Sequence, residues 1–235
     1  MRFSLLFITC LFLLVSCSDA DERTKKVLPS DLTLYATYSE EVVDSVWKCA
    51  SIASMDLETA NVKDLKTAGE KGLNQLVLPL NDYCVGFVDP KNKDKVTMLL
   101  SKKKIRKCFP KEMDFLWSDC ISPYSNSDKK GYLLYAVKKN GVKPLLTQND
   151  LLDISTETKN NKVIIALLLK SEAAQKFAEF TQVNIGKTIP IAINDIIISA
   201  PLVKTVIETG YVEISGDFTR EVANEIVERI QPTLH

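Results

Sequence analysis

The sequence predicts an α+β fold, in which an antiparallel sheet carries helices mainly on one face and follows a smaller α+β module. The stretch "NIGKTIPIAINDIIISAP" (184–201) alternates about Asn194-Asp195, as a β-hairpin does. The run "KVIIALLLK" (162–170) is apolar on both faces, which is typical of a central strand. The segment "REVANEIVERI" (220–230) places Val222, Ile226, Val227 and Ile230 on one helical face. Hairpins beside amphipathic helices favour antiparallel pairing with helices on the sheet.

The first residues predict an exported lipoprotein. Arg2 precedes an apolar run, Phe3–Val15, that is too short to span a bilayer, so residues 1–16 read as a signal peptide. Leu14–Cys17 resembles a lipobox, and we expect Cys17 to be acylated; an ordinary signal peptide with an incidental cysteine is the alternative. Residues 17–30 are polar and predict a flexible tether. The expected location is the bacterial cell envelope, on the periplasmic side or at the cell surface, with the lipid holding the protein to a membrane.

Charge and apolar runs exclude several classes of protein. The chain has 30 basic and 30 acidic residues, and removing residues 1–16 takes away only Arg2. A balanced charge gives no reason to expect nucleic acid as a partner. Beyond the leader the longest apolar run, Val163–Leu169, has the length of a strand, so we expect no transmembrane helix there.

Four cysteines follow Cys17, namely Cys49, Cys84, Cys108 and Cys120. In an exported chain they allow two disulfides with three connectivities. Buried thiols are the alternative, favoured for Cys49 because it shares a predicted helical face with Val42, Val46 and Ala53. The spacings do not match a zinc site and the sole histidine is His235, so we expect no metal.

Residues 31–121 predict the smaller module. Its expected elements are a strand at 32–38, a helix from Ser39 to about Ser54, strands at 76–80 and 85–89, helical turns within 92–110 and a strand at 112–118. Acidic residues in the first turn support the helix start. The basic cluster Lys102–Lys104, Arg106 and Lys107 indicates either a site for anionic lipid or polymer, or a solvated helix face. The polar stretch 122–130 predicts a loop and a domain boundary.

Residues 122–235 predict the larger domain. Strands are expected at 131–139, 162–170 and 211–215, with a helix at 172–184 capped by Ser171 and a last helix at 220–230. A two-residue turn pairs Ile193 with Ile196 and Ile191 with Ile198, so one hairpin face, facing the helices, should comprise Ile189, Ile191, Ile193, Ile196 and Ile198. The other face comprises Pro190, Ala192, Ile197 and Ser199. It is either closed by the smaller module or open as a face for a polypeptide or protein partner. Pro190 cannot donate a hydrogen bond, which favours an edge or a bulge.

Gly186-Lys187-Thr188 raises the question of a phosphate-binding loop. Such a loop needs an earlier glycine where Thr181 stands, and it follows a strand and opens a helix. Here a predicted helix comes first and a strand follows, so Gly186 reads as a helix C-terminal glycine. We expect no nucleotide and no cofactor. With one histidine, at the C-terminus, and no singled-out carboxylate pair, no catalytic residues are predicted.

Three stretches, "SEAAQKFAEFTQVNIG", "KTIPIAINDIIISAP" and "GYVEISGDFTREVANEI", together resemble one known domain. They are similar to the head of the first periplasmic domain in the SecD/SecDF family of bacterial protein-export subunits. The positions that carry the resemblance are Phe177-Ala178, Thr181, Asn184, Gly186-Lys187, Ser199–Pro201 and Ile214–Thr219. It implies a SecD head-like domain at 122–235, and residues 31–121 look like the region that precedes the head.

The family resemblance carries an expected function. Family members couple export to the proton-motive force through transmembrane helices, and no such segment is recognised in this sequence. The implied role is that of a non-catalytic, lipid-anchored envelope protein that binds exported polypeptide, the Sec translocase or another envelope protein. The alternative is a surface-exposed or structural lipoprotein that reuses the fold for an unrelated partner.

Overall fold

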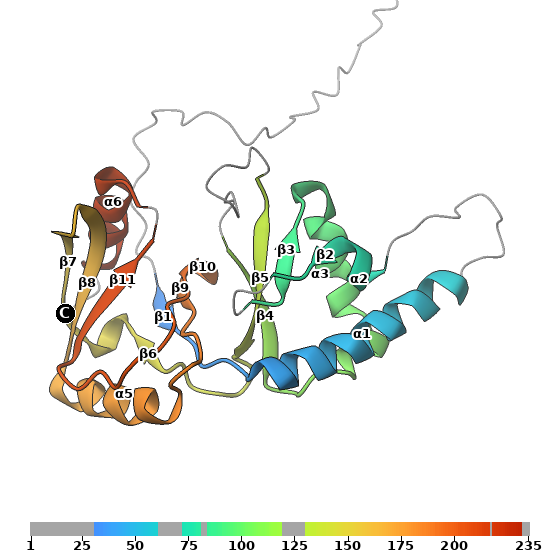
Figure 1. Ribbon diagram of the computed structural model, residues 1–235, viewed down its shortest axis with the longest axis horizontal. Helices are drawn as coiled ribbons and strands as arrows, with labels where there is room; N and C mark the ends of the chain where they lie inside the picture. Colours follow the sequence, from blue (N-terminus) through green and yellow to red (C-terminus); the bar gives the residue numbers. More distant parts are fainter. Residues whose placement is uncertain (1–30, 61–71, 81–83, 119–129, 217, 232–235) are drawn as a thin grey trace, which may run out of the picture.

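The computed structural model describes residues 31–60, 72–80, 84–118, 130–216 and 218–231. Two sheets and two groups of helices make up this part of the chain (Figure 1). The predicted lipidation site Cys17 and the candidate disulfide residue Cys120 lie outside the described residues.

The larger sheet has eight strands in the order β2-β3-β5-β4-β10-β9-β1-β6. In sequence order these are β1 (Leu32–Leu34), β2 (Val77–Leu78), β3 (Gly86–Val88), β4 (Met113–Ser118), β5 (Tyr132–Lys138), β6 (Leu146–Thr147), β9 (Ile191–Ile193) and β10 (Ile196–Ser199). Its neighbours pair antiparallel except β10 and β4, which run parallel over the two pairs Ile196–Trp117 and Ile197–Ser118.

The smaller sheet has three antiparallel strands in the order β11-β8-β7. They are β7 (Leu151–Lys159), β8 (Lys162–Leu169) and β11 (Tyr211–Ser215). The central position of β8 is as predicted. Strand β7 was not predicted, because it is mostly polar and buries only Leu151 and Ile154. Its hairpin with β8 turns through Asn160 and Asn161, which have φ of 51° and 60°.

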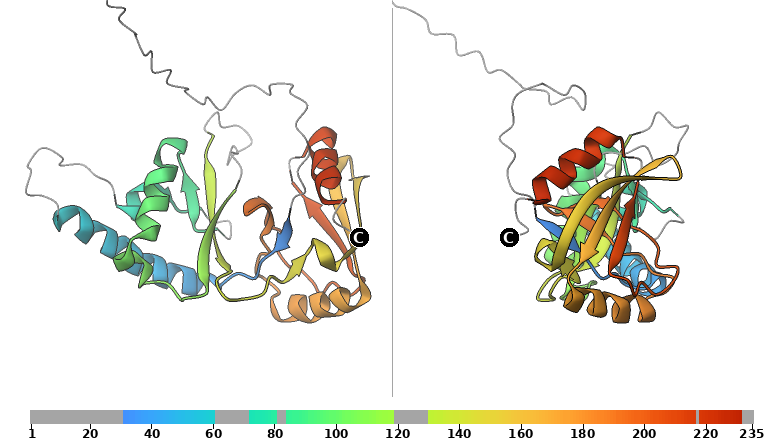
Figure 2. Two further views of the ribbon diagram at one scale, coloured as in Figure 1. Left: turned by 180° about the vertical axis from the view of Figure 1, so that it is seen from behind. Right: turned by 90° about the vertical axis from the view of Figure 1, so that its left-hand side faces the viewer.

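The helices divide between the two ends of the molecule (Figures 1 and 2). At one end are α1 (Glu40–Ala60), α2 (Leu73–Leu76), α3 (Lys93–Ser101) and α4 (Lys103–Arg106), with the 3₁₀ turn η1 (Pro90–Asn92). They enclose a core with Val88, Met113 and Leu134 of the larger sheet. At the other end are α5 (Ser171–Val183) and α6 (Arg220–Ile230), with η2 (Gln148–Asp150) before β7. They share a second core with β7, β8, β11, β9 and β1. The predicted α+β class is therefore confirmed.

Some helix details differ from the predictions. Helix α1 continues to Ala60, beyond the expected end near Ser54. Ser171 is the first residue of α5 and not its cap, since Lys170 occupies that position and no side chain bonds the first amides. Helix α6 buries Ala223 with Ile226, Val227 and Ile230, while Val222 is 45% exposed. Ala223 thus takes the place that the prediction gave to Val222 on the buried face.

The two predicted modules exchange strands. Leu32 and Leu34 of β1, from the N-terminal segment, are fully buried in the core with α5 and α6. Leu134 and Ala136 of β5, from the C-terminal segment, lie in the core with α1 and α3. β1 pairs with β9 and β6, and β5 pairs with β3 and β4. We propose that the folding unit of the head includes residues 31–38 as well as those after residue 122.

Candidate functional site

The hairpin face predicted as a partner surface is covered. Ala192 and Ile197 are 0% and 2% exposed, and they form a small core with Tyr35, Leu116 and Val137, to which Tyr135 also belongs. Pro190 is buried and Ser199 half-buried. The expectation of an open face on Pro190, Ala192, Ile197 and Ser199 is therefore wrong. The physical reason is that β10 joins β4, and the side chains of β4 and β5 close over the hairpin.

The hairpin register explains a second difference. Asn194 and Asp195 form the turn with φ of 50° and 64°, and Ile196 pairs with Ile193 as predicted. A bulge then follows, so that Ser199, rather than Ile198, lies opposite Ile191. Ile189, Ile191 and Ile193 are buried in the core with α5 and α6, as expected. Ile196 is 48% exposed, so it does not belong to that buried face.

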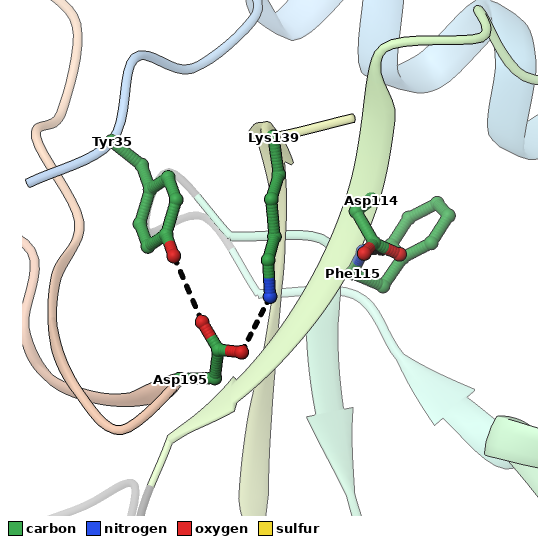
Figure 3. Close-up of polar contacts among 5 residues, drawn as sticks. All are labelled: Tyr35, Asp114, Phe115, Lys139 and Asp195. Carbon is green, nitrogen blue, oxygen red and sulfur yellow. Dashed lines mark hydrogen bonds and ion pairs between the residues drawn. The ribbon is translucent and has the colours of Figure 1, made fainter. Parts of the chain in front are cut away.

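The hairpin turn is held by two side chains from distant segments, Tyr35 directly after β1 and Lys139 directly after β5 (Figure 3). The Tyr35 hydroxyl donates a hydrogen bond to Oδ1 of Asp195 at 2.8 Å, and the Lys139 ammonium pairs with Oδ2. Burial raises the pKa of Asp195, but the hydrogen bonds from Lys139 and Tyr35 outweigh it and hold that pKa below its usual value. Burial, with the Asp195 carboxylate as second cause, raises the pKa of Tyr35. These contacts stabilise positive φ at a non-glycine residue.

Gly186-Lys187-Thr188 does not form a phosphate loop. Helix α5 ends at Val183, Gly186 has φ of 84°, and β9 follows. The Lys187 ammonium donates to Oδ1 of Asn184 at 2.9 Å, and its backbone N–H donates to the Asn184 carbonyl. The predicted helix-then-strand order is confirmed, and the lysine side chain folds back on the helix end rather than over a nest of amides.

Two of the four cysteines that follow Cys17 form a disulfide. Cys49 of α1 is joined to Cys108, just after α4, by a disulfide, so Cys49 is not a buried thiol. Cys84 lies in the β2–β3 connection, directly after residues 81–83, which are not described, and it is half-buried. The described residues contain no cluster of three or more His, Cys, Asp or Glu side chains that suits a metal ion. Within the same ranges, no helix has the length and apolarity needed to cross a membrane.

A slot of about 260 Å³ lies beside β11. It is lined by Tyr211, Val212 and Glu213 of β11 and by the buried side chains of Leu34 and Phe177. The remaining lining residues are Ile189, Ile191, Pro201, Leu202, Val203 and Ile207. Nearly all of these are apolar, so the slot suits aliphatic side chains.

The edge of β11 that borders this slot has no partner strand among the described residues. The N–H of Leu169 donates to the Gly210 carbonyl, so Gly210, Val212 and Ile214 direct their backbone groups at β8. By alternation, Glu213 and Ser215 direct theirs away from it. The Ser215 carbonyl accepts from Oγ of Ser199, which ties one end of β11 to β10. Among the described residues, the Glu213 N–H donates to no acceptor, which leaves it for a ligand.

Side chains of β11 leave this edge uncovered because they lie back over the sheet. The Tyr211 hydroxyl donates to Glu157 of β7 at 2.9 Å, and the Glu213 carboxylate pairs with Lys159, also on β7. Both contacts cross the central strand β8, away from the slot. The carboxylate of Glu213 is therefore held over the face of the sheet and not over the edge of β11.

Two residues fix the position of β11 and of the segment that precedes it. Thr181, fully buried on α5, accepts a hydrogen bond from the Ile207 N–H at 3.0 Å and so holds the segment before β11. Gly210 has φ of 68°, and a Cβ there would lie 2.7 Å from the Cβ of Ala174. Only glycine allows β11 to start this close to α5. Sequence reasoning found both β11 and Thr181 but not the slot. Only the positions of the neighbouring strands show that "YVEIS" has one partner instead of two.

Comparisons with known proteins match the part of the chain that contains β11 and the hairpin. Residues 122–231 match the family model "SecDF, P1 head subdomain". SecD of Rickettsia bellii is 34% identical over 100 residues, which cover 42% of this chain and 18% of the relative. SecD of Rhodothermus marinus is 24% identical over 213 residues, or 88% of this chain and 34% of the relative. The chain thus spans at most about a third of the length of these relatives.

Solved structures of SecDF were also found. One, of the membrane component SecDF that enhances protein export, aligns over 86% of this chain and 92% of its own, with 18% identity and a TM-score of 0.37. Another, from Thermus thermophilus, aligns over 86% of this chain and 28% of its own, with 17% identity and a TM-score of 0.34. The resemblance of residues 122–231 to the SecD/SecDF periplasmic head, as predicted from the sequence, is confirmed by the family model and the relatives.

Proposed function

Starting from a SecD-like head at residues 122–231, we propose that this protein binds extended polypeptide during protein export, and that it does so at the open edge of β11. The observation that carries the proposal is an unpaired strand edge beside an apolar slot. The relatives are subunits of the protein translocase, which is consistent with a polypeptide ligand.

Strand addition suits a ligand whose sequence varies. An extended segment laid along β11 would accept a hydrogen bond from the Glu213 N–H and extend the smaller sheet by one strand. Backbone hydrogen bonds are the same for every sequence, apart from proline. Every second side chain of the ligand would point into the slot, where aliphatic residues gain most from burial. The site would therefore favour extended, apolar-rich segments over folded proteins, in which most strands are paired and the edge strands are usually protected.

We also propose that Cys17 carries a lipid and holds this head on the periplasmic side of the envelope. The support is the short apolar run Phe3–Val15, whose last two residues begin the lipobox-like sequence Leu14–Cys17. Cys17→Ser should release the protein from membranes washed with about 0.5 M salt once its leader is removed, because such salt screens electrostatic contacts with the lipid surface. A processed Cys17→Ser protein that stays on the washed membranes would contradict the lipid anchor without affecting the binding proposal.

The binding proposal is tested by Glu213→Pro. Proline removes the outward N–H but leaves the β8 ladder intact, because the Glu213 amide does not take part in it. Glu213→Gln is the matched control, since it keeps the N–H and loses the charge that pairs with Lys159. We expect Glu213→Pro to weaken binding of an unfolded polypeptide about tenfold, roughly the value of one backbone hydrogen bond and a displaced strand, and Glu213→Gln to change it less than about twofold.

Binding would be measured by fluorescence anisotropy of a labelled, permanently unfolded polypeptide, with circular dichroism to verify that each variant is folded. Equal affinity of the proline variant and the parent would contradict strand addition at β11. If the parent itself binds no unfolded polypeptide at micromolar concentration, the alternative of a lipoprotein that reuses the head for an unrelated partner is favoured.

A further inference from the structure

The neutral chain contains one strongly basic segment. Residues 90–111, which cover η1, α3, α4 and the turn after it, hold nine of the 30 basic residues and one of the 30 acidic residues. The rest of the protein is correspondingly acidic. A charge separation of this size creates a local positive potential that the net charge hides.

The cations are concentrated on the turn around α4. Lys102, Lys103 and Lys107 are exposed, and none of them forms an ion pair with a described residue. Lys104, between them, is also exposed. We call Lys102, Lys103, Lys104 and Lys107 the lysine turn. The solvated helix face of the sequence analysis predicts this exposure too, so a second feature is needed to indicate a ligand.

That second feature is a rigid support with exposed apolar side chains near it. Ile105, in the middle of the lysine turn, is fully buried. Cys108, directly after Lys107, is joined by a disulfide to Cys49 of α1. Met98 lies one helical turn before Lys102 and is 48% exposed, while Ile52 lies one turn after Cys49 and is 56% exposed. Lysines beside exposed apolar side chains form the composition that binds at a bilayer interface, where the ammonium groups meet the headgroups and the apolar groups enter between them.

We propose that the lysine turn, with Met98 and Ile52, docks on an anionic phospholipid surface. Charge complementarity favours this occupant: four lysines present point charges on flexible stems, which suit a fluid array of phosphates. Nucleic-acid sites instead interleave arginine and aromatic side chains that stack on bases, and no aromatic residue stands within 102–107. The contact is independent of the polypeptide site on β11 and would act in addition to a lipid anchor.

The test uses residues 18–235, which keep every described element and omit the leader and Cys17. Parent protein would be mixed with phosphatidylcholine vesicles that contain either no phosphatidylglycerol or about 30% of it, and bound protein measured by flotation. The test variant is Lys102→Glu/Lys103→Glu/Lys107→Glu. The control, Lys143→Glu/Lys162→Glu/Lys204→Glu, changes the net charge equally at exposed lysines outside residues 90–111.

We expect the parent to bind the anionic vesicles at low salt, the test variant to lose at least about tenfold in partition coefficient, and the control to lose less than about twofold. About 0.5 M salt should abolish the difference between parent and test variant, because screening removes the attraction. Equal losses in both variants would overturn the lysine turn as the docking site. Absence of parent binding, equal binding to neutral vesicles, or tighter binding to duplex DNA than to anionic vesicles would overturn the phospholipid assignment.

Discussion

Adjacent residues of β10 offer a matched test of how the hairpin packs. Ile197 is 2% exposed in the core with Tyr35, Leu116 and Val137, whereas Ile196 is 48% exposed. Ile→Ala removes the same three carbons at both positions and changes strand propensity equally. At Ile197, the lost burial alone corresponds to about 2.5 kcal/mol at roughly 0.8 kcal/mol per methylene, and a residual cavity raises the loss to about 3–4 kcal/mol. At Ile196 the loss should stay below about 1 kcal/mol.

Urea unfolding followed by circular dichroism measures both variants. With a slope of about 2 kcal/mol per molar, Ile197→Ala should lower the midpoint by about 1.5–2 M and Ile196→Ala by less than about 0.5 M. Since propensity is matched, the difference reports burial alone. Losses within about 0.5 kcal/mol of each other would refute the burial of Ile197 against side chains of β4 and β5, and would restore the hairpin face as an exposed surface.

Three further changes test the joined modules. A protein limited to residues 122–235 lacks β1, with its buried Leu32 and Leu34, and also β4, so it should be at least about 4 kcal/mol less stable than residues 31–235; equal stability would show that the head does not need the residues before 122. Asp195→Asn should cost about 1 kcal/mol at pH 7, since the carboxylate is half-exposed. Because the folded state lowers the pKa of Asp195, this difference is present above about pH 4 and is lost as the pH falls through the folded pKa; a difference that does not decrease on acidification would contradict the contact. Cys49→Ser should lose up to about 4 kcal/mol and should match the chemically reduced parent, because the disulfide closes a loop of 59 residues.

Local patterns predicted the elements whose signals are local. The hairpin about Asn194-Asp195, the central strand β8 and the helix ended near Gly186 all follow from periodicity and turn residues. β7 was missed because its outward positions are polar and its apolar residues are few. The bulge that places Ser199 opposite Ile191 has no sequence signal of its own, since serine and isoleucine both fit the strand.

The candidate site could not be predicted from the sequence because it depends on pairing between segments that are distant in the chain. Nothing in "LTLYATY" indicates that β1 inserts between β9 and β6, or that Tyr35 reaches Asp195. The same contacts cover the hairpin face that the sequence predicted as a partner surface. Conversely, the edge of β11 is open because β8 is its only partner strand among the described residues. The amphipathic pattern of a strand is the same whether it has one neighbouring strand or two.

Hydrogen exchange at β11, measured amide by amide with and without an unfolded polypeptide, tests strand addition most directly. The Val212 and Ile214 amides already bond to β8 and should be protected in both states. The account predicts that polypeptide binding newly protects the outward amides of Glu213 and Ser215, so that protection becomes continuous along the strand. Binding that leaves these two amides exchanging as in the free protein would contradict polypeptide recognition at the edge of β11.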